Sequence, residues 1–218
     1  MILVSIDTST KFASIGLTSL KQSFYYNWES QYNHGVELTK NLKILLSKME
    51  AKASDLTHIA VALGPGGFSS VRVGISTALG LSTPNNLPII GVPTHDIQIE
   101  PFREKLDKNI NIISVIYAGR NEVSWKKYNI NETTTGISTF EKLTETSGKN
   151  DMFCGEYIHD KNLPKKSILL EKIVRDPKTF NNLAKNMFMD GTYKEYNEIK
   201  PIYSREPTIS SPKKQRIK

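Results

Sequence analysis

Two polar loops hold the groups that could bind a phosphate. The first consists of Asp7, Thr8, Ser9 and Thr10, directly after an apolar stretch at residues 2–6 that has the composition of a buried strand. Hydroxyls and backbone N–H groups in such a turn bind phosphate, and a carboxylate holds Mg²⁺ through water. That chemistry would be phosphoryl transfer or ATP binding. The alternative is an ordinary turn, since Asp, Ser and Thr are common residues after a strand.

The second loop contains Gly64, Gly66 and Gly67 and separates a predicted strand at 59–63 from a predicted helix. Free N–H groups and the positive end of the helix dipole attract an anion at such a place. The loop lacks the Lys-Ser ending of a Walker A motif and the spacing of a dinucleotide fingerprint. A phosphate site and a tight turn without a ligand therefore both remain open.

The helix after this loop, for which Ser69 is the expected N-cap, contains Gly74 and Gly80. A glycine inside a helix costs roughly 1 kcal/mol relative to alanine, so two of them indicate the close approach of another backbone. We expect that backbone to be another helix, in this chain or in a partner.

His34 begins a second predicted helix, at residues 34–50, which carries a stripe of leucines. A metal site here would need another histidine one turn later, and Leu38 occupies that position. The remaining histidines have no further ligand at suitable spacing: His58, His95 and His159. The single cysteine, Cys154, has no disulfide partner and is expected as a small buried residue. The sequence therefore predicts no catalytic residue and no metal site.

The predicted elements follow one order twice, with the second version shorter. Strands are expected in the first half at 2–6, 13–17, 24–28, 59–63 and 88–93, and helices at 34–50, from 70 and from 94. Strands are expected in the second half at 112–117, 122–128, 137–140, 152–155 and 168–174, and helices at 141–147 and 177–189. A three-stranded meander followed by alternating helices and strands is typical of the ribonuclease H-like fold. We predict an α/β protein with two βββαβα-type subdomains, the second reduced, at 1–100 and 101–204, and a disordered basic tail at 205–218.

The composition predicts a soluble globular protein. The 218-residue chain is 38% hydrophobic with a formal net charge of +7, and its apolar runs fall short of the roughly 20 residues that cross a bilayer. The start lacks the basic region of a signal peptide, so we expect a cytoplasmic protein without membrane contact. Positive charge favours a polyanionic partner, and its one dense run, at residues 213–218, could contact tRNA phosphates.

The stretch from Gly64 to Leu81 resembles the signature of the bacterial TsaB (YeaZ) proteins. That family usually has Gly-Pro-Gly-Ser-Phe-Thr-Gly-Leu-Arg-Val-Gly where this chain has Gly-Pro-Gly-Gly-Phe-Ser-Ser-Val-Arg-Val-Gly. Residues 2–10 and 201–205 extend the resemblance over nearly the whole chain. Where the family commonly has Asp-Ala-Arg after the first strand of the second half, this chain has Tyr117-Ala-Gly-Arg120 and so lacks the acid.

The resemblance implies a fold of the actin-like ATPase (ASKHA) superfamily and a non-catalytic role. It implies a subunit that acts with a TsaD-like catalytic subunit and a TsaE-like ATPase to make threonylcarbamoyladenosine at position 37 of tRNAs that read codons beginning with A. Contact with tRNA would then be indirect, through the complex. No cofactor would be bound stably, although ATP or ADP could bind at the interface of the complex.

The resemblance also implies pairing through the two helices of the first half, with TsaD or, in the isolated protein, with a second copy. The implied interface residues are His34, Leu38, Val71, Arg72, Gly74, Ile75, Ala78 and Gly80. TsaD carries a His-x-x-x-His pair on the helix where this chain has His34 and Leu38, which favours the non-catalytic assignment. The alternative is a stand-alone enzyme of the same superfamily, either a kinase-like ATPase or an M22-type metallopeptidase.

Overall fold

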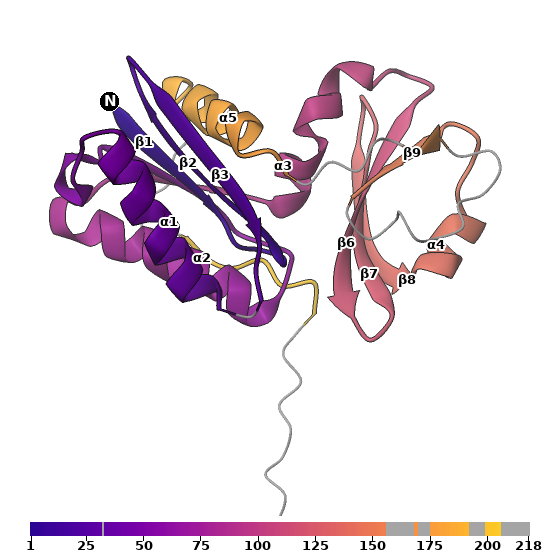
Figure 1. The fold of residues 1–218 in the computed structure, drawn as a ribbon. Helices are drawn as coiled ribbons and strands as arrows, with labels where there is room; N and C mark the ends of the chain where they lie inside the picture. Colours follow the sequence, from indigo (N-terminus) through magenta and orange to yellow (C-terminus); the bar gives the residue numbers. More distant parts are fainter. Residues whose placement is uncertain (32, 156–167, 170–174, 192–198, 206–218) are drawn as a thin grey trace, which may run out of the picture.

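The computed structural model of the protein describes residues 1–31, 33–155, 168–169, 175–191 and 199–205. These residues form two α/β subdomains, each built on a five-stranded sheet (Figure 1). His159, most of the strand expected at 168–174 and residues 206–218 of the predicted basic tail lie outside the described residues.

The first sheet has the strand order β3-β2-β1-β4-β5. Its strands are β1 (Ile2–Asp7), β2 (Phe12–Ser19), β3 (Ser23–Glu29), β4 (His58–Ala62) and β5 (Ile89–Val92). β1 pairs antiparallel with β2 and parallel with β4. Parallel strands need a crossover connection, which explains the helix before β4 and the helix after it.

Helices cover both faces of this sheet (Figure 1). They are α1 (His34–Lys48) and α2 (Phe68–Ser82) on one face and α5 (Pro177–Met189) on the other. Because neighbouring residues of a strand point to opposite faces, Val4 packs with the leucines of α1, whereas Leu3 packs against Phe180 of α5. With both faces covered, the inner strands are buried over most of their length.

The second sheet repeats the topology of the first, in the order β10-β9-β6-β7-β8. Its strands are β6 (Asn111–Gly119), β7 (Glu122–Tyr128), β8 (Thr133–Thr139), β9 (Asp151–Cys154) and β10 (Ile168–Leu169). α4 (Phe140–Glu145) packs on one face, and α3 (Thr94–Ile99) with the following 3-10 helix (Glu100–Lys105) packs on the other. Two further 3-10 turns, Ala53–Asp55 and Thr83–Asn85, flank β4 and α2.

The two-subdomain α/β fold predicted from the element order is confirmed, although β8 begins at Thr133 rather than at residue 137. Two further details differ. The N-cap of α2 is Gly67 rather than Ser69, because the helix begins at Phe68. α5 follows the second sheet in the chain but packs on the first, so residues 177–189 do not belong with the second subdomain as predicted. Burial of Phe180 and Ala184 against β1 and β4 accounts for this position.

A buried polar network ties α3 to the second sheet, while Ile97 of α3 packs in the core of the first subdomain. The imidazole of His95 lies between two hydroxyls, with Nδ1 2.8 Å from Oγ of Ser114 and Nε2 3.1 Å from Oγ of Ser124. Gln98 donates to the carbonyls of Val115, at 3.2 Å, and Cys154, at 3.1 Å. Burial lowers the pKa of His95 to about 3, so the ring is neutral at physiological pH.

This pKa predicts a stability that falls in mild acid. Between the unfolded pKa near 6.5 and the folded value of about 3, only the unfolded state binds the proton of His95. The free energy of unfolding should therefore drop by about 1.4 kcal/mol per pH unit below about pH 6.5 through this residue alone. Urea unfolding at several pH values tests this, with His95→Gln as the comparison. An equally steep slope in His95→Gln would contradict the assignment.

Candidate functional site

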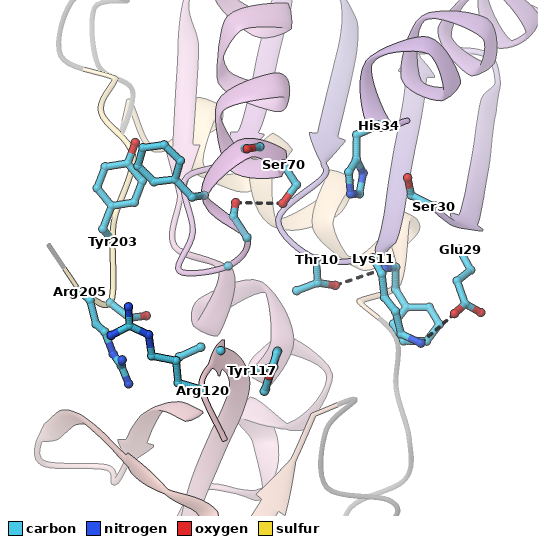
Figure 2. Close-up of a pocket in the computed structure, with 18 of the residues that line it drawn as sticks. Thr10, Lys11, Glu29, Ser30, His34, Ser70, Tyr117, Arg120, Tyr203 and Arg205 are labelled. Atoms are coloured by element: carbon cyan, nitrogen blue, oxygen red, sulfur yellow. Dashed lines mark hydrogen bonds and ion pairs between the residues drawn. The ribbon is translucent and has the colours of Figure 1, made fainter. Parts of the chain in front are cut away.

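A cleft of about 1410 Å³ lies where the two subdomains face each other. One wall comes from the first subdomain: the β1–β2 turn, the start of α1 and the loop before α2. The other wall is the β6–β7 turn, residues 117–120, and residues 203–205 complete the lining. Figure 2 shows Tyr117 and Arg120 across from Thr10 and His34. The structure thus brings both predicted phosphate loops to one cleft.

A buried arginine binds the turn after β1 from its inner side. Asp7 is fully buried and forms an ion pair with Arg175, which is 2% exposed. The same guanidinium donates to Oγ1 of Thr10 at 2.8 Å and to the carbonyl of Phe12 at 3.0 Å. The Asp7 carboxylate also accepts from the Ser9 backbone N–H, at 2.9 Å, and hydroxyl, at 2.6 Å. A metal-bound phosphate at Asp7 would have to displace Arg175, so these contacts favour the ordinary-turn interpretation.

The glycine loop packs directly against that turn. The Gly67 N–H donates to the carbonyl of Ser9 at 2.8 Å. A Cβ at Gly66 would stand 2.0 Å from the same oxygen, which explains the need for glycine. Gly64 has φ of 95° and contacts the backbone of Ile202. This packing supports a tight turn and uses the Gly67 N–H that a phosphate would need.

Most residues of the predicted interface face inward, toward the first sheet. The buried members of that set are Leu38, Val71, Gly74, Ile75 and Ala78, all on the faces of α1 and α2 that pack on the first sheet. A Cβ at Gly74 would stand 2.6 Å from Oγ1 of Thr8, so this glycine serves packing within the chain. Arg72 and Gly80 are exposed, and half-buried His34 lines the cleft. Partial burial lowers the pKa of His34.

The sequence does not predict the role of several residues that line the cleft. Phe68 stacks on Tyr203 with ring centroids 5.0 Å apart, and the Arg72 guanidinium lies 3.9 Å from the Phe68 centroid. Nε of Arg72 donates to the Tyr203 hydroxyl at 2.7 Å. Tyr203 reaches this place because the backbone N–H of Ile202 donates to the carbonyl of Leu63 at 2.7 Å. The family resemblance at residues 201–205 indicated that this segment has a role, but it did not indicate that the segment lies in the cleft.

Two features are absent from the described residues. None of their helices is long and apolar enough to cross a membrane. They also contain no group of three or more His, Cys, Asp or Glu side chains that could hold a metal ion.

Comparison with known proteins places the chain in a family. It is 28% identical over 172 residues to the tRNA threonylcarbamoyladenosine biosynthesis protein TsaB of Buchnera aphidicola, a match that covers 79% of this chain and 69% of that protein. TsaB of Escherichia coli is 27% identical over 132 residues, which cover 61% of this chain and 57% of the relative. The family model described as "TsaD: tRNA N6-adenosine threonylcarbamoyltransferase" matches residues 29–176. The chain belongs to this TsaD-related family of TsaB (YeaZ) proteins.

The fold agrees with TsaB membership. YeaZ from Pseudomonas aeruginosa superposes with a TM-score of 0.75 at 20% identity, covering 93% of this chain and 99% of that chain. A second P. aeruginosa structure, described as similar to peptidase YeaZ, gives 0.76 over 94% of this chain and 99% of that one, also at 20% identity. The TsaB signature contributes the glycine loop and α2, and the divergent Tyr117–Arg120 turn faces them across the cleft.

The two glycines of the TsaB signature helix make a matched pair for testing the packing. We expect Gly74→Ala to destabilise the fold by about 1–3 kcal/mol, because its Cβ would collide with Thr8. Gly80→Ala should stabilise it by up to about 1 kcal/mol, since nothing lies within 4 Å of the new Cβ. Urea unfolding of both variants measures the difference. Equal stability of the two would show that Gly74 does not pack on Thr8.

The buried ion pair should be essential for stability. We expect Arg175→Met to cost about 3–5 kcal/mol, because the Asp7 carboxylate would remain buried without its partner. The double variant Asp7→Asn with Arg175→Met should regain part of that loss. As a control, Lys11→Met removes an exposed pair with Glu29, which should cost less than about 1 kcal/mol. Equal losses for Arg175→Met and Lys11→Met would refute the buried role.

Proposed function

We propose that this protein is a non-catalytic subunit for threonylcarbamoyladenosine synthesis at adenosine 37 of tRNAs that read codons beginning with A. It acts with a TsaD-like catalytic subunit and a TsaE-like ATPase, and it meets tRNA in their complex. ATP or ADP then binds at the interface of the complex rather than stably to this chain. Membership of the TsaB family supports the pathway.

The ion pair between Asp7 and Arg175 carries the non-catalytic part of the proposal. Phosphoryl transfer uses carboxylates to hold Mg²⁺ against the phosphates. Here the carboxylate of the β1–β2 turn is fully buried and already neutralised by a guanidinium. The position one turn after His34 is likewise filled by the buried side chain of Leu38, where a metallopeptidase would need a ligand.

The outer faces of α1 and α2 are the surface that fits a partner. Val36 on α1 is 73% exposed and Ile44 is 41% exposed, both on the side away from the first sheet. On α2, Gly80 is exposed and leaves open space above the helix. A partner helix can approach closely there, and apolar side chains would be buried on pairing. We assign this surface to the TsaD-like subunit, or to a second copy in the isolated protein.

Depletion of the protein in its own cells tests the pathway. Threonylcarbamoyladenosine in bulk tRNA, measured by nucleoside mass spectrometry, should fall and return on re-expression of the wild-type chain. Re-expressed Val36→Arg should restore it poorly and should fail to copurify the TsaD-like protein, because a charge would be buried at the interface. Ile130→Arg, in the β7–β8 turn and 57% exposed, is the matched control and should restore it fully.

Three results would count against the proposal. Unchanged nucleoside levels after depletion would exclude the pathway role. Equal rescue by Val36→Arg and Ile130→Arg would exclude the helix surface. Multiple-turnover release of phosphate from ATP, or cleavage of peptides, by the purified chain would support the enzyme alternative.

A further inference from the structure

The interdomain cleft is lined by aromatic rings that stay exposed. Tyr117 on the second wall is 50% exposed and Phe68 on the first is 42% exposed. Tyr203 stands beside Phe68, its ring stacked at 5.0 Å and its hydroxyl bound by Arg72 at 2.7 Å. These contacts fix the orientation of Tyr203 in advance. Tyr203 is thus partly exposed and held in place, and Tyr117 is half exposed. Such rings are surfaces on which planar groups can stack, at little entropic cost where the ring is already oriented.

The charged residues that line the cleft are mainly cations. Its described lining includes Lys11, Arg120 and Arg205 and one carboxylate, Glu29, which lies 2.7 Å from Lys11, and Arg205 is paired with Glu122 beside the cleft. Arg120 is presented by a tight turn in which Gly119, Arg120 and Asn121 have φ of 78°, 54° and 59°. Together with the net charge of +7, this lining suits an anionic ligand.

The contacts on the first wall discriminate among anionic ligands. A nucleoside triphosphate with Mg²⁺ needs a carboxylate and free N–H groups, whereas Asp7 is paired with Arg175 and the Gly67 N–H is bonded to Ser9. Single-stranded RNA needs neither, because it binds through base stacking on aromatic rings and phosphate contacts with lysine and arginine. A duplex would hide its bases from those rings.

We propose that this cleft binds a short single-stranded segment of RNA, with bases stacked on Tyr117 and Tyr203 and phosphates near Arg120 and Lys11. The inference rests on the proposed function, in which the nucleic acid is tRNA. It adds direct contact between this chain and unpaired nucleotides, in place of the indirect contact expected from the sequence.

Fluorescence anisotropy with a short, fluorescein-labelled RNA of mixed sequence tests the proposal on the full-length protein. Tyr117→Ala should weaken binding about fivefold or more, and Tyr117→Phe should retain it, since stacking needs only the ring. Tyr26→Ala is the matched control, because Tyr26 is 48% exposed on the edge strand β3 and does not line the cleft. It should bind like the wild type.

A second pair of variants tests the phosphate contact. Arg120→Asn removes the charge and keeps a residue that tolerates positive φ. It should weaken binding and make the salt dependence shallower by about 0.7 in log–log slope. Arg103→Asn removes an exposed arginine outside the cleft and should leave that slope nearly unchanged.

Four outcomes would overturn the cleft assignment: no RNA binding, equal losses in Tyr117→Ala and Tyr26→Ala, equal affinity for the duplex of the same sequence, or binding abolished by deletion of residues 206–218 alone. Loss of the TsaD-like partner in Tyr117→Ala without RNA binding would make the cleft a protein-binding site instead.

If depletion lowers threonylcarbamoyladenosine while the Tyr117 variants bind RNA normally, the pathway role stands and the cleft inference fails. If depletion changes nothing, the pathway role fails whatever the cleft binds.

Discussion

The buried ion pair between Asp7 and Arg175 is the constraint on which the rest of the structure depends. It joins the end of the first strand to a residue two positions before α5, and so fixes where that helix begins to cover the first sheet. A buried charge is stable only when it is paired and hydrogen-bonded. Arg175 meets this requirement, because it also donates to Thr10 and to the carbonyl of Phe12 at the start of β2. The same pairing removes the carboxylate that would make the turn a metal site. The position of α5 and the pairing of that carboxylate thus depend on the same contact.

Local pattern was enough for most of the fold. Apolar strands such as 59–63, the leucine stripe of α1 and Pro177 at the start of α5 each predict their own element, because these signals act over a few residues. The partner of α5 was not predictable in this way. Phe180 and Ala184 form an apolar face that fits either sheet, and only the fold brings them to Leu3 and Ala60.

The arrangement of the candidate site was even harder to predict from local sequence patterns. Both phosphate loops were located from sequence, but the contact between Arg175 and Asp7 spans 168 positions and leaves no local trace. The structure buries Val71, Gly74, Ile75 and Ala78 on the inner face of α2. The sequence did not indicate whether these residues meet a partner or the sheet. The sequence showed that the Tyr117–Arg120 turn lacks the acid common in the family. It did not show that this turn lies opposite the glycine loop, because that depends on how the two sheets pack together.

The position of α5 has a consequence for synthesis of the chain. While the ribosome makes the first hundred residues, one face of the first sheet can receive α1 and α2. On the other face, Leu3, Ala60, Ala62 and Ile90 lack the cover that Phe180 and Ala184 provide until residues 177–189 emerge. Contacts of such sequence separation slow folding and leave apolar surface open to aggregation or chaperones. The first subdomain therefore completes its core last, after the second has been made, although it begins the chain.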